Sequence, residues 1–306
     1  MRLSKLALPL AVIGLLLSWP SAFPAIRIAV REYSPLEVTA FRLSVAALLM
    51  FSIGAFKGMG RPRRIHFLPI MVCGIVGLMV YNLGLGYGML TISASAAGFI
   101  IALGPVFIVI FSALFLHEVV GWKTRAGIAL SFVGATLIAV GKAGGFSLEW
   151  GAFYVLLSAL SAAVMTLTQK PLLSHYTAYD LTAYMTLCAA LSVLPLGWTV
   201  FPKVYLAFHQ SVMATSSVWA MLHLAVSVSF IGYLLWGYVL SQLPASRVAS
   251  LMYLIPISAT LIAWGWIGEV PSVTTLIGGG IVIAGVAIVN IRRMQKKQPV
   301  EVMAVE

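Results

Sequence analysis

Charged side chains are scarce in this sequence of 306 residues, and their scarcity excludes a water-soluble globular protein. Asp, Glu, Lys and Arg make up 9% of the residues, hydrophobic residues make up 61%, and the mean hydropathy is +1.03. So few polar side chains cannot cover a surface that faces water, and we therefore expect the chain to lie within a lipid bilayer.

The motifs of metal, nucleotide and serine chemistry are also absent. The sequence has no H-E-x-x-H, no Walker loop, no G-x-S-x-G and no cluster of Cys and His, so we expect no cofactor, no metal and no enzyme. Cys73 and Cys188 lie in separate apolar runs, which favours buried thiols over a disulfide. An intramembrane enzyme is the rival class, and it would need polar groups that converge at mid-membrane. Four of the five histidines are instead scattered over different segments: His117, His175, His209 and His223.

Long apolar runs predict ten transmembrane helices, each of about 20 residues, the length that crosses a ~30 Å hydrocarbon core. Helices are expected because lipid offers backbone groups no partner, and no run alternates as a barrel strand does. The first run has the charges of a secretory signal, but Pro20 at the −3 position disfavours cleavage after Ala22, so we expect it to stay as a helix. The predicted spans are 7–30, 37–57, 67–89, 94–116, 122–141, 150–170, 179–201, 216–241, 247–267 and 273–291.

Acidic residues are fewer than basic ones, and the basic residues are distributed unequally between the two sides of the predicted membrane domain. The 19 Lys and Arg against 8 Asp and Glu give a net charge of +11. With the N-terminus in the cytoplasm, fourteen basic residues fall in cytoplasmic segments and four outside, which follows the positive-inside rule. We therefore expect both termini to be cytoplasmic, in a bacterial inner membrane. The basic residues are loop anchors beside acidic lipid, so no nucleic acid is expected as a partner.

The sequence repeats itself. Residues 81–140 align without a gap on residues 232–291, 151 positions later, with twelve of sixty positions identical. A weaker match at an offset of 143 places Arg27 opposite Lys170 and Glu37 opposite Asp180. The identical residues include those with special backbone or charge roles, in both halves: Gly86, Tyr87, Ala94, Ser95, Pro105, Glu118, Val119, Gly127 and Gly134.

Two related halves are therefore expected, residues 1–145 and 146–294, followed by a cytoplasmic tail at 295–306. Five helices per half is an odd number, so the second half must enter the membrane from the opposite side. Inverted repeats of this kind are typical of secondary transporters. A duplicated bundle without a transport role is the alternative.

Several tracts carry a family resemblance. Residues 19–27, which begin Trp-Pro-Ser-Ala-Phe, resemble the W-G-S-x-F opening of the EamA branch of the drug/metabolite transporter superfamily. Further similar tracts follow in order: Ser34-Pro35, Phe41-Arg42-Leu43, Tyr81-Asn82, Gly86-Tyr87, and Glu118 with Gly127 and Gly134. The sequence departs from the pattern at Pro20 and His117, where the family has Gly. The resemblance covers residues 10–291 and implies ten helices, an inverted five-plus-five repeat, and export of small metabolites such as amino acids.

Aromatic and amide side chains on the third, eighth and ninth predicted helices, with others on the first and sixth, suit a small and partly apolar solute. Asn82 and Tyr233 are matched in the repeat, and Phe230, Tyr233 and Trp236 share one helical face. Packing or lipid-facing aromatics are the alternative interpretation. The predicted substrate-binding residues are Trp19, Asn82, Met165, Gln169, Phe230, Tyr233, Trp236 and Tyr253.

Prolines and carboxylates in the predicted helices are candidates for conformational hinges and gates. Prolines free backbone carbonyls and bend membrane helices, and carboxylates at helix C-termini oppose the helix dipole, so both classes are candidates for hinges or gates. For the carboxylates a structural bridge is favoured over a gate latch. The candidates are Pro20, Pro24, Pro105, Pro256, Glu118 and Glu269. Arg42 lies within a span, and a structural ion pair with Glu37 is favoured over contact with substrate.

Glycines recur every seven residues at Gly127, Gly134 and Gly141, and again at Gly278 and Gly285. Such stripes favour close helix packing or an oligomer seam, so an oligomer is possible. The expected function is a secondary transporter that exports amino acids or related metabolites. A drug or cation efflux pump, an uptake carrier of the same fold, an intramembrane enzyme and a scaffold are the alternatives. No carboxylate is predicted at mid-membrane, which favours a facilitator, or a proton taken by His223 or the substrate.

Overall fold

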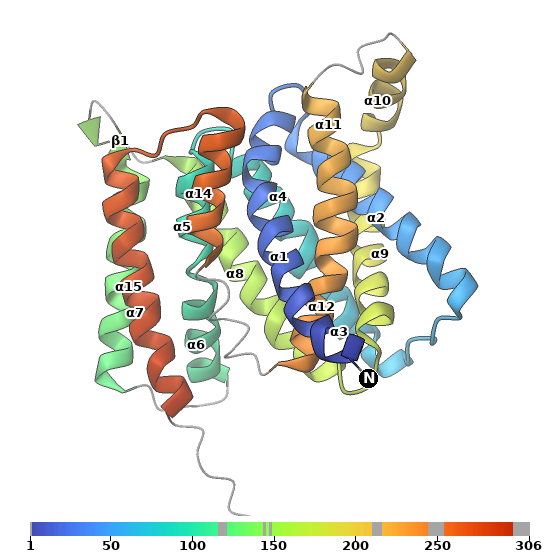
Figure 1. Cartoon of the computed structure of the whole chain (residues 1–306), viewed down its shortest axis with the longest axis horizontal. Helices are drawn as coiled ribbons and strands as arrows, with labels where there is room; N and C mark the ends of the chain where they lie inside the picture. The colour runs from blue at the N-terminus through green and yellow to red at the C-terminus, as the bar shows by residue number, and fades with distance from the viewer. Residues whose placement is uncertain are drawn as a thin grey trace, which may run out of the picture.

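The structure, a computed structural model, describes residues 2–115, 121–142, 145–146, 149–209, 216–243 and 254–295, which form a bundle of helices (Figure 1). In the first half the elements are α1 (Arg2–Ala29), α2 (Pro35–Lys57), η1 (Arg64–His66), α3 (Phe67–Val72), η2 (Cys73–Val80), α4 (Tyr81–Gly88), α5 (Ala94–Ile101), α6 (Gly104–Phe115) and α7 (Trp122–Val140). After the paired two-residue strands β1 (Gly141–Lys142) and β2 (Gly145–Phe146) come α8 (Trp150–Leu172), α9 (Ala178–Gly197), α10 (Val200–His209), α11 (Ser216–His223), η4 (Leu224–Gly232), α12 (Tyr233–Gln242), α14 (Leu254–Ile267) and α15 (Val273–Gln295).

Eight helical stretches are long and apolar enough to cross a membrane. They are Leu6–Ala29, Pro35–Phe56, Arg64–Gly88, Ala94–Phe111, Trp122–Val140, Trp150–Leu172, Ala178–Gly197 and Ser216–Gln242. Two shorter apolar helices, Leu254–Ile267 and Val273–Val289, lie within the last two predicted spans. The chain is therefore a helical, multi-pass membrane protein, and eight of its ten predicted spans reach full length within the described residues.

Matching caps begin the second helix of each half. The Ser34 hydroxyl accepts from the Glu37 backbone N–H, and the Glu37 carboxylate accepts from the Ser34 N–H, which makes a capping box at the start of α2. At the start of α9 the Thr177 hydroxyl accepts from the Asp180 N–H. These side chains satisfy donors that a helix N-terminus leaves free. The sequence match of Glu37 with Asp180 thus reflects a shared helix start.

Two spans contain a π-helical segment at matching positions of the repeat. η2 begins at Cys73 and η4 at Leu224, which is 151 residues later. The span continues as α-helix on both sides, through α3 and α4 in one half and α11 and α12 in the other. A π-helix closes each hydrogen bond one residue further along than an α-helix, so side chains shift around the axis. Regular helical spacing, which we assumed for Phe230 and Tyr233, does not hold across η4.

The predicted span 94–116 is interrupted. α5 ends, a two-residue turn of Ala102 and Leu103 follows, and α6 begins. Pro105 is therefore the second residue of α6, where a proline costs no helical hydrogen bond. Pro256, its match in the repeat, lies in the first described turn of α14.

Pro20 and Pro24 lie inside α1, which runs without a break from Arg2 to Ala29. Each ring removes a backbone donor and leaves a carbonyl about one turn earlier without its usual partner. Both prolines are buried. The helix continues past both prolines inside the bundle.

The halves pack on each other through reciprocal contacts. α2 packs on α9, and α7 packs on α15 (Figure 1). α1 packs on α11, η4, α12 and α14, while α8 packs on η2, α4, α5 and α6. Since α1 and α8 are matched in the sequence, the first helix of each half contacts the third and fourth spans of the other half. The interface between the halves is thus built twice from equivalent surfaces.

Glycines bring α7 and α15 into backbone contact. A Cβ added at Gly134 would lie 2.6 Å from the Gly278 carbonyl oxygen, and one added at Gly127 would lie 2.8 Å from the Gly285 oxygen. These pairs are reciprocal, because Gly127 and Gly134 match Gly278 and Gly285. The glycine stripe is therefore a packing surface within one chain, with backbones too close for any side chain.

We expect Gly278→Ala to lower the free energy of unfolding by about 1–3 kcal/mol, because its Cβ would lie 2.8 Å from the Gly134 oxygen, a backbone atom that cannot move freely. Gly280→Ala, two residues away on the same helix, is the matched control, since a Cβ there meets nothing within 4 Å. Thermal unfolding of both purified variants in detergent measures the difference. Equal stability of the two would show that α7 and α15 do not touch in this register.

Candidate substrate site

Two matched residues of the repeat bond to each other at the centre of the bundle. The Asn82 Nδ2–H donates to the Tyr233 hydroxyl over 2.8 Å, and these residues are 151 positions apart. Both are buried, with exposed fractions of 2% and 4%. Since the two residues come from the two parts of the repeat, their contact lies between these parts. The candidate site therefore lies where the halves meet.

Two further aromatic rings and one amide lie beside this bond. Trp19 of α1 stacks on Trp236 of α12, with ring centroids 4.9 Å apart, and meets Tyr233 edge to face at 6.5 Å. The Trp236 indole N–H donates to Gln169 Oε1 of α8 over 3.1 Å. Five of the eight predicted substrate-binding residues are thus brought together from α1, α4, α8 and α12.

The cluster holds three buried polar atoms without a hydrogen-bond partner among the described residues: Trp19 Nε1, Asn82 Oδ1 and Gln169 Nε2. The amide orientations follow from their neighbours. Asn82 Nδ2 must face the Leu78 carbonyl, which only a donor can satisfy, and Gln169 Oε1 must face the Trp236 N–H. Two donors and one acceptor therefore remain unpaired, which is costly unless a ligand pairs with them.

Of the described residues among the other predicted ones, Met165 and Phe230 make no hydrogen bond or ring contact with this cluster. Met165 is buried, and its side chain packs on Gly77 of η2, where it fills the space that a Cβ would occupy. Phe230 is half-buried on η4 and packs against the same apolar core as Tyr233. Tyr253 lies outside the described residues.

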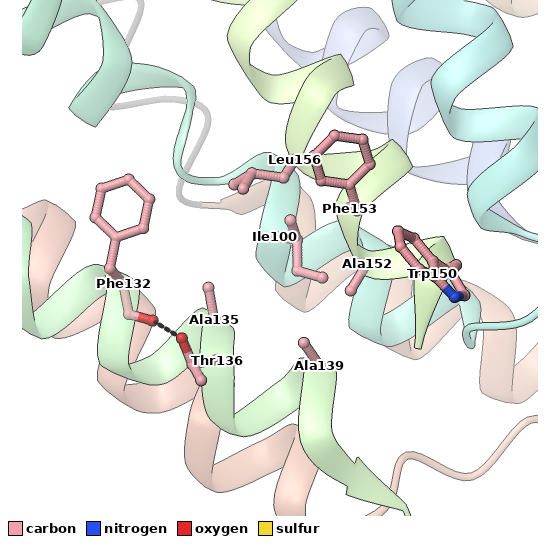
Figure 2. Close-up of a pocket in the computed structure, with 9 residues that line it drawn as sticks. All are labelled: Ile100, Phe132, Ala135, Thr136, Ala139, Trp150, Ala152, Phe153 and Leu156. Atoms are coloured by element: carbon pink, nitrogen blue, oxygen red, sulfur yellow. Dashed lines mark hydrogen bonds between the residues drawn. The ribbon is translucent and has the colours of Figure 1, made fainter. Parts of the chain in front are cut away.

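A cavity of about 210 Å³ lies elsewhere, between α5, α7 and α8 (Figure 2). Its lining residues are Ile100, Phe132, Ala135, Thr136, Ala139, Trp150, Ala152, Phe153 and Leu156. The Thr136 hydroxyl donates to the Phe132 carbonyl of its own helix, as the dashed line in Figure 2 shows. Trp150 and Phe153 are largely exposed, so the cavity opens on the apolar outer surface of the bundle. It offers a polar solute nothing comparable to the cluster around Trp19.

Arg42 does not pair with Glu37, so that prediction is wrong. Glu37 Oε1 instead accepts from the Lys203 ammonium at 2.5 Å and the Thr199 hydroxyl at 2.9 Å. Arg42 is 2% exposed and donates from Nε to the Ser229 hydroxyl of η4 over 2.8 Å. The long connection between α9 and α11 brings Lys203 to the start of α2, which sequence spacing could not reveal.

Glu269 has partners that the local sequence did not offer. Its Oε1 accepts from the Ser95 N–H at 3.3 Å, and its Oε2 lies 3.9 Å from Arg27 Nε. Arg27 also donates through Nη1 to the carbonyls of Met89 and, at 3.0 Å, Ile92. One cation thus ties α1 to the end of α4 and to the segment after α14. Glu118, which matches Glu269 in the repeat, lies outside the described residues.

Lys170 repeats this clamp in the other half. Its Nζ donates to the carbonyls of Leu240 and Leu243 at 2.5 and 3.0 Å, and these carbonyls lie 151 residues after the two that Arg27 binds. Cations near a helix C-terminus satisfy carbonyls that the helix leaves free. Arg27 ends α1 and Lys170 ends α8, so the clamps hold opposite ends of the bundle. The match of Arg27 with Lys170 was the sequence signal for them.

Other polar contacts near the cluster were not predicted. Ser21 Oγ lies 2.8 Å from His223 Nε2, and His223 packs edge to face on Trp266. Ser18 donates to the Ser227 carbonyl at 2.6 Å. Serines on apolar helices carry no sequence signal that separates them from packing residues. Among the described residues no group of three or more His, Cys, Asp or Glu could hold a metal ion.

A helical membrane protein with two related halves and a polar, aromatic cluster between them has the form of a secondary transporter. The model of the EamA-like transporter family matches residues 7–140 and 149–291, which is nearly the whole chain. The protein belongs to this family, and the predicted resemblance to EamA transporters is confirmed.

Relatives cover almost the full chain. A probable terminal-alkyne amino-acid exporter of Streptantibioticus cattleyicolor is 34% identical over 97% of each sequence. A pseudopaline exporter of Pseudomonas aeruginosa is 27% identical over 85% of this chain and 87% of its own. A solved crystal structure with 19% identity superposes with a TM-score of 0.62 and covers 94% of this chain and 98% of its own, which supports the fold alone. The relatives support a membrane exporter of small metabolites.

We expect Trp236→Phe to lower the free energy of unfolding by about 1–3 kcal/mol more than Trp19→Phe, since both remove similar ring area but only the Trp236 N–H has a partner. Trp236→Phe would leave Gln169 Oε1 buried and unpaired, whereas Trp19→Phe removes a donor that is already unpaired. Thermal unfolding of the two purified variants in detergent compares them. A larger loss in Trp19→Phe would contradict this hydrogen-bond assignment.

Proposed function

We propose that this protein exports amino acids or closely related small zwitterions across a bacterial inner membrane by alternating access. The observation that carries the proposal is the cluster between the halves, where buried donors and an acceptor remain unpaired beside stacked aromatic rings. An amino acid offers both kinds of partner within a few atoms. The names of two relatives, an amino-acid exporter and a pseudopaline exporter, support the same class of solute.

The proposed architecture has ten transmembrane helices in two inverted halves, residues 1–145 and 146–294, with a cytoplasmic tail at 295–306. Its support is the reciprocity of matched contacts, above all Asn82 with Tyr233 and the two glycine pairs of α7 and α15. Exchange of conformations between such halves would open the central cluster first to one side and then to the other.

The proposed orientation places both termini in the cytoplasm. The start of α1 and the end of α15 lie at the same end of the bundle (Figure 1). Basic residues gather at that end under the positive-inside rule. Arg27 and Glu269 then lie near the outer surface and Lys170 near the inner one.

Gating is proposed for the outer end. The Arg27 clamp and its contact with Glu269 join α1, α4 and α14, so breaking them would separate helices from both halves. Pro105 lies in the first turn of α6 and Pro256 in the first described turn of the matched helix α14, while Pro20 and Pro24 lie in α1 shortly before Arg27. These prolines are the proposed hinges. Glu118 is the proposed counterpart of Glu269 at the inner end, on its sequence match alone.

A carrier for cationic drugs is the second candidate, because stacked tryptophans attract cations. Trp19 and Trp236 would suit such a ligand. The buried Arg42, which bonds to Ser229 on the span that carries Trp236, would repel a cationic drug. Its charge therefore favours a zwitterionic amino acid as the substrate.

Transport in proteoliposomes tests the proposal. We expect the wild-type protein to exchange internal for external L-propargylglycine, the simplest terminal-alkyne amino acid, whose alkyne allows chemical tagging for detection. Trp19→Phe should raise the half-saturating concentration by roughly tenfold because it removes an unpaired donor from the site. Trp219→Phe, on the exposed face of α11, is the control and should change nothing. If neither propargylglycine nor L-phenylalanine is exchanged by the wild type, amino-acid export is wrong.

Cysteine labelling tests orientation and gate, in a background with Cys73 and Cys188 replaced by Ala. An impermeant thiol reagent applied outside intact cells should label Glu32→Cys, between α1 and α2, and should reach Arg61→Cys, between α2 and η1, only after permeabilisation. The reverse pattern would invert the proposed topology. Ser21→Cys, buried below Arg27, should label faster from outside when Glu269→Gln is added. An unchanged rate would remove Glu269 from the gate.

A further inference from the structure

Arg42 is a buried cation whose hydrogen-bonding capacity is mostly unused. Its side chain is 2% exposed, and among the described residues its one hydrogen bond runs from Nε to the Ser229 hydroxyl. A guanidinium carries five N–H donors, so both terminal nitrogens are left to find partners. A charged group in hydrocarbon without a partner is costly, and intramembrane charges of this kind mark ligand or ion pathways.

The described carboxylates do not neutralise Arg42. Glu37, five residues earlier on α2, is held by Lys203, Thr199 and its own helix cap. Glu269 faces Arg27 at the far end of α1. Within the described part of the chain, the positive charge of Arg42 is therefore balanced by nothing that the structure pairs with it.

Arg42 lies beside the candidate site rather than apart from it. Ser229, its partner, lies near the end of η4, four residues before Tyr233 on the same span. The Ser227 carbonyl, two residues before Ser229, accepts from Ser18, the neighbour of Trp19. Arg42 and the three residues with unpaired atoms thus contact one short stretch of the same span, from Ser229 to Trp236.

Charge complementarity identifies the ligand group. We propose that Arg42 binds the carboxylate of the transported solute, while Asn82 Oδ1 accepts from its amino group. This inference rests on the proposed function and narrows the substrate to small carboxylates that also carry an N–H donor. The planar fork of arginine suits a carboxylate because it can form two parallel hydrogen bonds.

Ser229 is a positioning residue in this arrangement. Its hydroxyl accepts a hydrogen bond from Arg42 Nε–H. The two terminal nitrogens of the guanidinium then remain available for the ligand carboxylate. Trp19 Nε1 and Gln169 Nε2, the two unpaired donors, can add hydrogen bonds to the carboxylate or to polar atoms of the solute side chain. The stacked rings of Trp19 and Trp236 offer the apolar part of the solute a flat wall.

The test compares solutes that differ only in the carboxylate. Calorimetric titration of the purified full-length protein in detergent measures the affinity for L-propargylglycine, L-phenylalanine and the amide of each. We expect the wild type to bind each free acid at least tenfold more tightly than its amide, about 1.4 kcal/mol. Arg42→Gln should lose this preference through weaker binding of the acids, with amide affinity changed by less than about threefold. Arg42→Lys, which keeps the charge, should keep a preference for the acids.

Arg31→Gln, at the exposed end of α1, is the matched control and should retain the full preference. Equal affinity of the wild type for acid and amide would overturn the role of Arg42 but would not contradict the proposed transport function. This comparison uses the wild-type protein alone, so it does not depend on whether a variant folds. An Arg42→Gln protein that folds and still prefers the acids would do the same. Binding of neither acid nor amide by the wild type would reject the proposed function and this inference together.

Discussion

Lipid offers no hydrogen bonds, and this constraint accounts for most of the unusual contacts in the molecule. Every backbone group in the hydrocarbon core must find a partner within the protein, so a helix that ends or loosens there needs side chains to complete it. Arg27 and Lys170 supply donors to the carbonyls where α4 and α12 end. Ser158 donates to the Tyr81 carbonyl near the end of η2 in the same way. The polar residues of this apolar chain therefore gather where helices are irregular.

Irregular helices also position the site. η2 and η4 lie at matched places in the two halves, and each leads directly into the helix that carries Asn82 or Tyr233. A π-helical turn shifts the side chains that follow it around the helix axis, and Asn82 and Tyr233 bond to each other just after these segments. Because the amides of Asn82 and Gln169 bond to Tyr233 and Trp236, they hold the aromatic rings in place while keeping one polar atom each unpaired. The same two hydrogen bonds thus fix the aromatic rings and leave Asn82 Oδ1 and Gln169 Nε2 free for a ligand.

The helical membrane class, the family and five members of the central cluster could be predicted from the sequence. They depend on long apolar runs, on motifs in a fixed order and on the internal repeat, all of which can be read directly from the residues. Asn82 and Tyr233 were linked by their shared position in the repeat, and a contact across an axis follows from such a match. The partner of Arg42 was predicted wrongly, since Glu37 is near in sequence but is held by Lys203 of α10. The π-helical segments escaped prediction because hydrophobic periodicity does not separate them from regular turns. Met165 shared the chemistry of the cluster but lies behind it, against Gly77, and only packing reveals that difference.

One element breaks the symmetry of the two halves. α10 lies between α9 and α11, whereas α2 and η1 are joined by residues 58–63 without a helix, and this insertion accounts for the shift of the repeat from 143 to 151 positions. Two identical halves that exchange conformations would give two states of equal free energy. α10 adds an ion pair, Lys203 with Glu37, to one side of the bundle. Under alternating access, the substrate-free carrier would therefore favour one of its two facings, and α10 would set that preference through its ion pair with Glu37.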